Sequence, residues 1–258
     1  LANSIPIFRR TMSLPYRISF PMIGFTYFVP LPLSFSLWLF CLFSTIQQGL
    51  FNMTGFGTFE PLPYSSEKPL ISWQSLGSLF VIVIYGLWIA RKQIRDVFRK
   101  GIGKEKDDAL DYEIVSYKFA FWGLLISLLV IFWWLILSGL PPFPSIFFII
   151  CMFIIFIGIT RVICEGGLAA TRAPIIAPVM TTSFFGSKNL GPSALGSLGL
   201  TFVYSSDVRT FVMASVANGL KILEEVKGKK KIIFGAILIS ILCTLISSIW
   251  TVIFFGYK

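Results

Sequence analysis

Residues 160–210 contain the stretches TRVICEGGLAATRAPIIAPVM (160–180) and SFFGSKNLGPSALGSLGLTFVYSSDVRT (183–210). Both stretches are apolar enough to enter a lipid bilayer, but glycines, prolines and isolated charges interrupt them. Backbone that is neither helix nor closed barrel persists at membrane depth only where protein or a watery cavity surrounds it. We therefore expect a membrane protein in which this segment is a broken element beside a substrate or ion path.

The composition of the whole chain favours a membrane location. Of the 258 residues, 55% are hydrophobic and 13% are charged, and the mean hydropathy is +0.82. Soluble domains carry a much larger share of charged residues. The sequence therefore predicts an all-α fold, a polytopic transmembrane helical bundle with about five full spans plus broken or re-entrant segments.

The hydrophobic runs give the order of the predicted elements within one transmembrane bundle, residues 1–258. Runs long enough to cross a bilayer lie near residues 18–45, 71–90, 115–138, 145–163 and 232–255. Pro30 and Pro32 predict a break or a sharp kink in the first run. Residues 174–204 form two shorter apolar pieces around a polar turn, which predicts a re-entrant hairpin or, alternatively, an ordinary pair of short helices. Residues 209–223 have helical apolar spacing and predict an interfacial helix.

Charge asymmetry orients these spans. Lysine and arginine concentrate in the loop 91–106 and in the stretch 221–231. The positive-inside rule predicts that both lie on the cytoplasmic side of a multi-pass protein whose immediate partner is membrane lipid. The net charge of +10 therefore indicates membrane orientation, and no nucleic-acid partner is expected.

Several chemistries are excluded by residue type. The chain has no histidine, which removes histidine-ligated haem, histidine-based zinc sites and Ser-His or Cys-His catalytic pairs. Its four cysteines have no CxxC spacing and are typical of small buried hydrophobic residues. We expect no catalytic residues, no metal site and no cofactor, and the protein is not predicted to be an enzyme.

Arg161 and Glu165 stand four residues apart, on one face of a helix. They indicate either a buried ion pair that orients the broken segment or binds a charged ligand, or a helix-terminal pair at the membrane surface. Gly166 and Gly167 follow directly and would let backbone approach a ligand or a neighbouring helix closely.

Asp207 and Arg209 lie at the start of the predicted interfacial helix. Asp207 is typical of a helix N-cap, and the same carboxylate could bind a proton or a cation. The predicted substrate or ion path consists of Arg161, Glu165, Gly166, Gly167, Asp207 and Arg209.

Three stretches carry a resemblance to a known group of proteins. They are IGFTYFVPLPLSFSLWLF (23–40), Arg161-x-x-x-Glu165-Gly166, and Ser206-Asp207-x-Arg209 running into Met213, Asn218 and Lys221. In these stretches the chain resembles an uncharacterised group of large bacterial polytopic membrane proteins, distantly related to the oligopeptide transporter superfamily. It departs from the group's pattern at Pro32, where an acidic residue is expected, and at Ala214, where proline is usual.

The resemblance implies that these residues form the C-terminal part of a longer transporter-like protein in the bacterial inner (cytoplasmic) membrane. It also implies uptake of a small solute or peptide coupled to protons. The alternative is a non-transporting structural or accessory subunit of a larger membrane complex, whose partners would be other membrane subunits. A lipid-acting membrane enzyme ranks last, because the sequence contains no nucleophile paired with a base.

Overall fold

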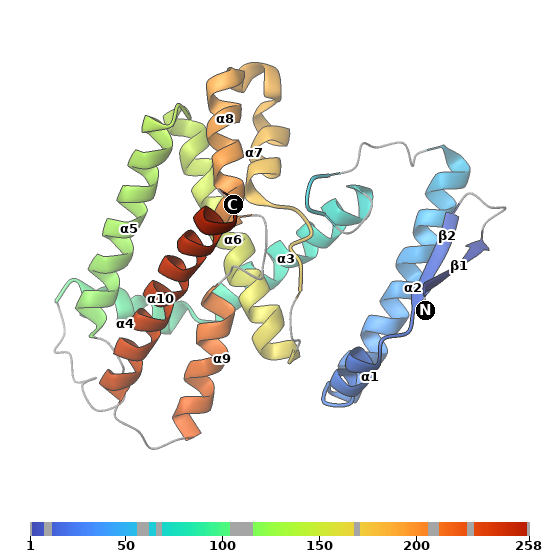
Figure 1. The fold of residues 1–258 in the computed structure, drawn as a ribbon, viewed down its shortest axis with the longest axis horizontal. Coiled ribbons are helices and arrows are strands. Elements are labelled where there is room, and N and C mark those ends of the chain that lie inside the picture. Colours follow the sequence, from blue (N-terminus) through green and yellow to red (C-terminus); the bar gives the residue numbers. More distant parts are fainter. Residues whose placement is uncertain are drawn as a thin grey trace. The chain divides into compact units, whose positions relative to one another are not determined.

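The structure is a computed structural model that describes residues 2–7, 12–55, 62–65, 69–103, 116–167, 171–205, 212–225 and 230–256. Figure 1 shows the elements as ribbons. In chain order they are β1 (Ala2–Ile7), β2 (Met12–Arg17), α1 (Phe20–Thr26), α2 (Leu31–Thr54), α3 (Pro69–Ile89), α4 (Arg91–Gly101), α5 (Tyr117–Leu137), α6 (Pro142–Gly166), α7 (Ala177–Phe185), α8 (Ser187–Ser205), α9 (Val212–Glu225) and α10 (Lys230–Gly256).

Five helices in the described part of the chain are long and apolar enough to cross a membrane. They are α2, α3, α5, α6 and the Gly235–Gly256 part of α10. Helices satisfy their own backbone hydrogen bonds, which lipid cannot do for them. The chain is therefore a multi-pass integral membrane protein, and the predicted all-α class is confirmed.

A short antiparallel hairpin precedes the helices and was not expected from the sequence. Its register pairs Ala2 with Arg17 and Ile7 with Met12. Pro6 and Pro15 stand within the two strands, where proline normally argues against a strand. In a two-stranded sheet both strands are edges, so a proline can stand where its missing N–H would have faced outward.

The proline-rich run near residue 30 separates a short helix from a long one. Helix α1 ends at Thr26, and α2 begins at Leu31 with Pro30 as its N-cap. Proline fits there because the first turn of a helix has no partner for its N–H groups. The second helix continues to Thr54 and ends at Gly55, whose φ of 79° is left-handed. Helix α2 therefore extends beyond the predicted span 18–45, to Thr54.

The basic stretch 91–106, expected as a loop, begins with a helix. Helix α4 runs from Arg91 to Gly101 directly after α3, and only Ala90 separates the two helices. Ile94, Val97 and Phe98 supply its helical apolar spacing. The dense lysines and arginines between them obscured that spacing in the sequence.

The chain divides into two compact units. One comprises residues 1–86 and 132–215, and the other comprises residues 87–131 and 216–258. In the first unit α6 packs against α7, and α7 packs against α8 (Figure 1). Phe148, Met152, Ile155 and Ile159 form part of the buried side of α6, at the spacing of one helical face.

Helices α3 and α6 approach closely where α6 lacks a side chain. A Cβ atom added at Gly158 would lie 2.6 Å from Cγ of Leu79. Farther along both helices, Arg161 donates a hydrogen bond to the carbonyl of Ile82. Both contacts join α3 and α6 where the two helices cross. Small residues permit such close helix packing in membranes.

The substitution Gly158→Ala tests this contact. We expect it to destabilise the protein by about 1–3 kcal/mol, because the added methyl overpacks against the buried Leu79. Thermal unfolding of the purified protein in detergent measures the loss, and adding Leu79→Ala should restore part of it. Gly123→Ala in α5 is the matched control, since a Cβ there meets nothing within 4 Å. Equal melting temperatures for Gly158→Ala and Gly123→Ala would contradict the close approach.

Candidate functional site

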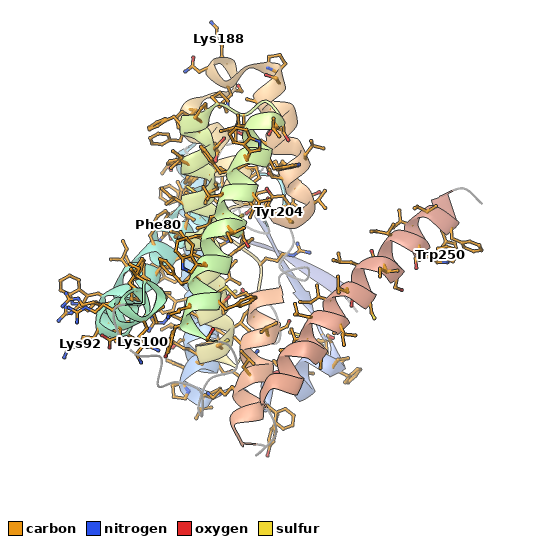
Figure 2. The ribbon with its side chains drawn as sticks, turned by 90° about the vertical axis from the view of Figure 1, so that its left-hand side faces the viewer. Phe80, Lys92, Lys100, Lys188, Tyr204 and Trp250 are labelled. Carbon is orange, nitrogen blue, oxygen red and sulfur yellow. The ribbon has the colours of Figure 1, made fainter. Side chains whose placement is uncertain are left out.

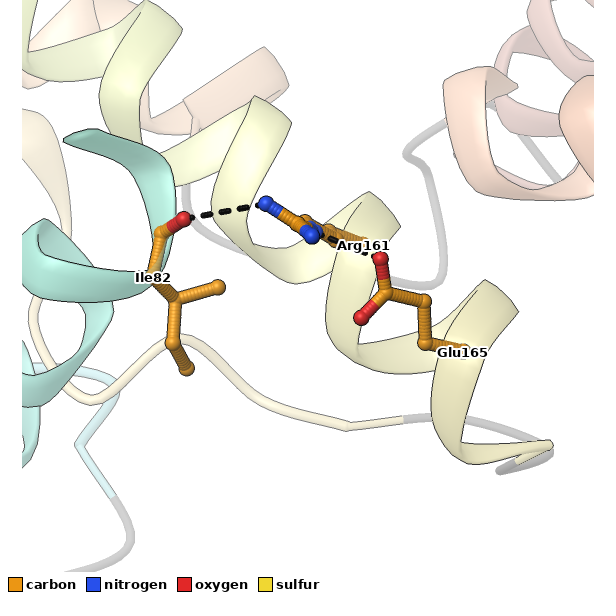
Figure 3. A network of polar contacts seen from close by, with 3 residues as sticks. All are labelled: Ile82, Arg161 and Glu165. Atoms are coloured by element: carbon orange, nitrogen blue, oxygen red, sulfur yellow. Dashed lines mark hydrogen bonds and ion pairs between the residues drawn. The ribbon is translucent and has the colours of Figure 1, made fainter. Parts of the chain in front are cut away.

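Arg161 and Glu165 form an ion pair near the C-terminal end of α6 (Figure 3). The Arg161 Nε donates a hydrogen bond to Glu165 Oε1 across 2.5 Å. The pair spans one turn of a continuous helix, so its geometry follows from the four-residue spacing. Among the predicted site residues that the structure describes, these two side chains are in contact.

The second contact of Arg161 is to the backbone of α3. Its Nη1 donates to the carbonyl oxygen of Ile82 across 3.2 Å. A Cβ added at Gly86 would lie 1.9 Å from that same Nη1. In a helix, the side chain of a residue lies beside the backbone carbonyl of the residue four positions earlier. Residue 86 stands four positions after Ile82, so a glycine there leaves the Ile82 carbonyl accessible.

Sequence reasoning missed Ile82 and Gly86. The available signal was a lone glycine inside the bulky apolar run Tyr85-Gly86-Leu87. A glycine inside a helix is destabilising relative to alanine by about 1 kcal/mol. Here the missing side chain at Gly86 leaves room for the guanidinium of Arg161.

Helix stability alone does not explain why Glu165 stands in this position. The Arg161 side chain is 27% exposed and that of Glu165 is 64% exposed, and a solvated pair at this spacing contributes only about 0.5 kcal/mol. Glu165 also lies in the last turn of α6, where the negative end of the helix disfavours a carboxylate. The pair therefore contributes little to the stability of α6.

Gly166 and Gly167 end the helix. Gly167 follows the last residue of α6 as its C-cap, with φ 62° and ψ 28°. Glycine occupies this left-handed region without the strain that a side chain would bring. A Cβ at Gly167 would meet nothing within 4 Å among the described residues, so the left-handed conformation at the helix end, and not a close approach to one of the described helices, accounts for this glycine.

Asp207 and Arg209 lie outside the described residues. Their membership of the site therefore stays a prediction from the sequence.

The segment 171–205 is a discontinuous hairpin. Residues 171–176 are not helical, α7 covers only Ala177–Phe185, and Gly186 makes the turn into α8. Helix α8 is itself broken at Gly191, whose φ of 76° and ψ of 170° suit only glycine. Pro192 then restarts the helix from its first turn.

This hairpin extends along the length of α6. It starts beyond Gly167, at the C-terminal end of α6, but its tip lies beside the first turns of that helix. There Phe147 stacks on Phe184 with ring centroids 4.6 Å apart, and Phe143 meets Phe185 edge-on at 5.7 Å. The end of the irregular segment 171–176 lies inside the protein, where Ile175 and Ile176 are both 1% exposed, whereas Arg172 near its start is exposed.

Hydroxyl groups are buried on both arms of the hairpin. Thr181 on α7 and Ser197, Thr201 and Ser205 on α8 are all buried. Thr181, Thr201 and Ser205 donate to backbone carbonyls of their own helices. Within the described part of the chain, Ser197 Oγ has no hydrogen-bond partner, and neither has the buried hydroxyl of Tyr204.

Such unpartnered groups are costly to bury, so they indicate a place where water or a polar solute can bind. The sequence analysis singled out none of these hydroxyls, because small residues near glycines are more often packing residues.

The described residues do not provide a set of side chains that could together bind a metal ion. No group of three or more cysteine or acidic side chains converges within those ranges. What the arrangement offers is one largely exposed carboxylate, one guanidinium held by a backbone carbonyl, and two buried hydroxyls without a partner among the described residues.

Comparison with known proteins gives one match. A model of a family of unknown function, DUF6785, matches residues 4–258. No curated protein and no solved structure matches the chain.

The Arg161 anchor can be tested with Gly86→Ala. We expect the added methyl to displace the guanidinium and cost about 1.5–3 kcal/mol, the range for a hydrogen bond to a charged group. Equilibrium unfolding followed by tryptophan fluorescence measures the change. In an Arg161→Ala background the same substitution should cost little, because no guanidinium remains to be displaced.

Gly77→Ala serves as the control on the same helix, where a Cβ meets nothing within 4 Å. Additive effects of Gly86→Ala and Arg161→Ala would contradict the anchoring contact.

Proposed function

The chain belongs to the DUF6785 family of unknown function, and on that premise we propose that it is a transporter-like module that moves a small solute or peptide coupled to protons. Its resemblance to relatives of the oligopeptide transporter superfamily supports this proposal. We also propose that it lies in the bacterial inner membrane, as the resemblance implies, with the basic stretches 91–106 and 221–231 on the cytoplasmic side, as the positive-inside rule predicts.

The discontinuous hairpin 171–205 is the observation that carries the proposal. Broken helices inside a membrane bundle are tolerated only where protein or a polar cavity surrounds them. In secondary transporters such segments form the substrate and ion sites. Here the break occurs along α6, and the buried Ser197 hydroxyl on the returning arm has no partner among the described residues.

The Arg161–Glu165 pair supplies a simple means of coupling. In the resting state Glu165 accepts the hydrogen bond from Arg161 Nε. When Glu165 takes up a proton, the carboxylate loses its charge and the Nε donor becomes available. A solute carboxylate can then bind the guanidinium, which the Ile82 carbonyl still holds in place. Loss of the proton on the other side restores the ion pair and displaces the solute.

A second candidate is a non-transporting subunit of a membrane complex. It is favoured by one observation: no side chain is buried in the described residues 235–256 of α10. Partner helices could cover such a face as well as lipid does. A partner that copurifies in fixed stoichiometry, together with no transport by the reconstituted complex, would favour this alternative.

Glu165→Gln tests the coupling in proteoliposomes loaded with a pH-sensitive dye. With alanyl-alanine added outside, the wild-type protein should produce a peptide-dependent proton flux. The variant should abolish that flux, because an amide cannot take up and release the proton. The readout is the initial rate of acidification of the lumen.

Asp96→Asn is the matched control, because it removes an exposed carboxylate on α4 and should leave the flux unchanged. Wild-type flux in Glu165→Gln would refute the coupling role. If the wild-type protein gives no flux with any short peptide, peptide transport itself is wrong.

A further inference from the structure

Helix α4 carries opposite characters on its two sides. Ile94, Val97, Phe98 and Gly101 recur every three or four residues and therefore share one side. The remaining positions hold Arg91, Lys92, Arg95, Arg99 and Lys100, with Asp96 as the acid among them. A helix with this division lies in the plane of a membrane interface rather than across it.

Packing contacts within its own unit hold α4 at that level. At its start, the guanidinium of Arg91 lies 4.6 Å above the ring of Trp88, close to the end of α3. At its end, Phe98 meets Phe121 of α5 with ring centroids 5.3 Å apart.

A Cβ added at the buried Gly101 would lie 2.8 Å from Cβ of Phe121, so α4 and α5 are in close contact here. The ammonium of Lys100 lies 4.9 Å from the ring of Tyr117, the first residue of α5. Both ends of α4 therefore lie where membrane-spanning helices end, the level of the lipid headgroups.

The outward arc of α4 is cationic. Arg91, Lys92 and Arg95 are exposed, and Figure 2 shows Lys92 projecting outward from the helix. Arg99 already has an interaction partner, so it is not counted among the cations available to a ligand. The single negative charge of Asp96, the acid on this arc, is too small to neutralise the remaining cations.

We propose that the α4 arc formed by Arg91, Lys92 and Arg95 binds the headgroup phosphates of anionic phospholipids. Charge complementarity supports this occupant, because each phosphate at the bilayer surface is an anion at the height of these cations. The aromatic residues at both ends of α4, Trp88 and Tyr117, are of the type that anchors membrane proteins at the same level. An acidic protein as the occupant would give no reason for these aromatic residues at the two ends of α4.

The test is native mass spectrometry of the full-length chain in detergent, with equimolar phosphatidylglycerol and phosphatidylcholine. The wild-type protein should retain phosphatidylglycerol preferentially, and added salt should weaken that preference. The variant Lys92→Gln/Arg95→Gln should bind phosphatidylglycerol about fivefold more weakly for each cation removed. Neither side chain contributes to the α4–α5 packing, so circular dichroism and thermal unfolding should match the wild type.

Two further variants decide the interpretation. Lys92→Arg/Arg95→Lys keeps the charge and should keep the preference, whereas Arg172→Gln/Lys188→Gln removes two charges elsewhere and should also keep it. The proposal is overturned if Lys92→Gln/Arg95→Gln retains wild-type preference for phosphatidylglycerol. It is equally overturned if the wild type shows none, or if an acidic protein rather than lipid copurifies on these residues.

Discussion

The position of the charged groups in the candidate site depends on Gly86 of α3, because this residue has no side chain to cover the helix backbone. An arginine near the end of an apolar helix normally extends toward water. Here one nitrogen of Arg161 is held by the Ile82 carbonyl, and a side chain at position 86 would occupy its place. The guanidinium is therefore fixed from α3, while Glu165, its partner on α6, stays largely exposed. The Arg161 guanidinium is thus held in place by α3, whereas the Glu165 carboxylate can exchange Arg161 for another partner.

The backbone of the hairpin obeys a related constraint. Residues 171–176 have no helix to satisfy their polar groups, so they must lie against protein. Their buried isoleucines provide that environment, and the stacked phenylalanines at the tip hold α7 against the start of α6. Gly186 and Gly191 then allow the turn into α8 and the kink within it, two conformations that other residue types adopt with strain. Apolar packing on α6 thus supports an irregular segment beside a long apolar helix.

The sequence predicted the features that depend on the length and hydropathy of its apolar runs. The all-α class and the five apolar spans follow from apolar run length, and the pairing of Arg161 with Glu165 follows from spacing along one helix. The contact between Arg161 and Ile82 joins residues 79 positions apart, which no local pattern encodes. Helix α4 was missed because its cations hid a short apolar repeat. Gly167 was expected at a ligand or a helix contact, yet its left-handed φ explains it. For Asp207 and Arg209 the sequence remains the only guide.

The contact between Arg161 and α3 uses a backbone atom, the carbonyl oxygen of Ile82. Every residue type supplies that oxygen, so the contact does not depend on which side chain stands at position 82. It does depend on position 86, where a Cβ would lie against the guanidinium. The anchor of Arg161 is therefore specified by the absence of a side chain at one position and is indifferent to the side chain at another.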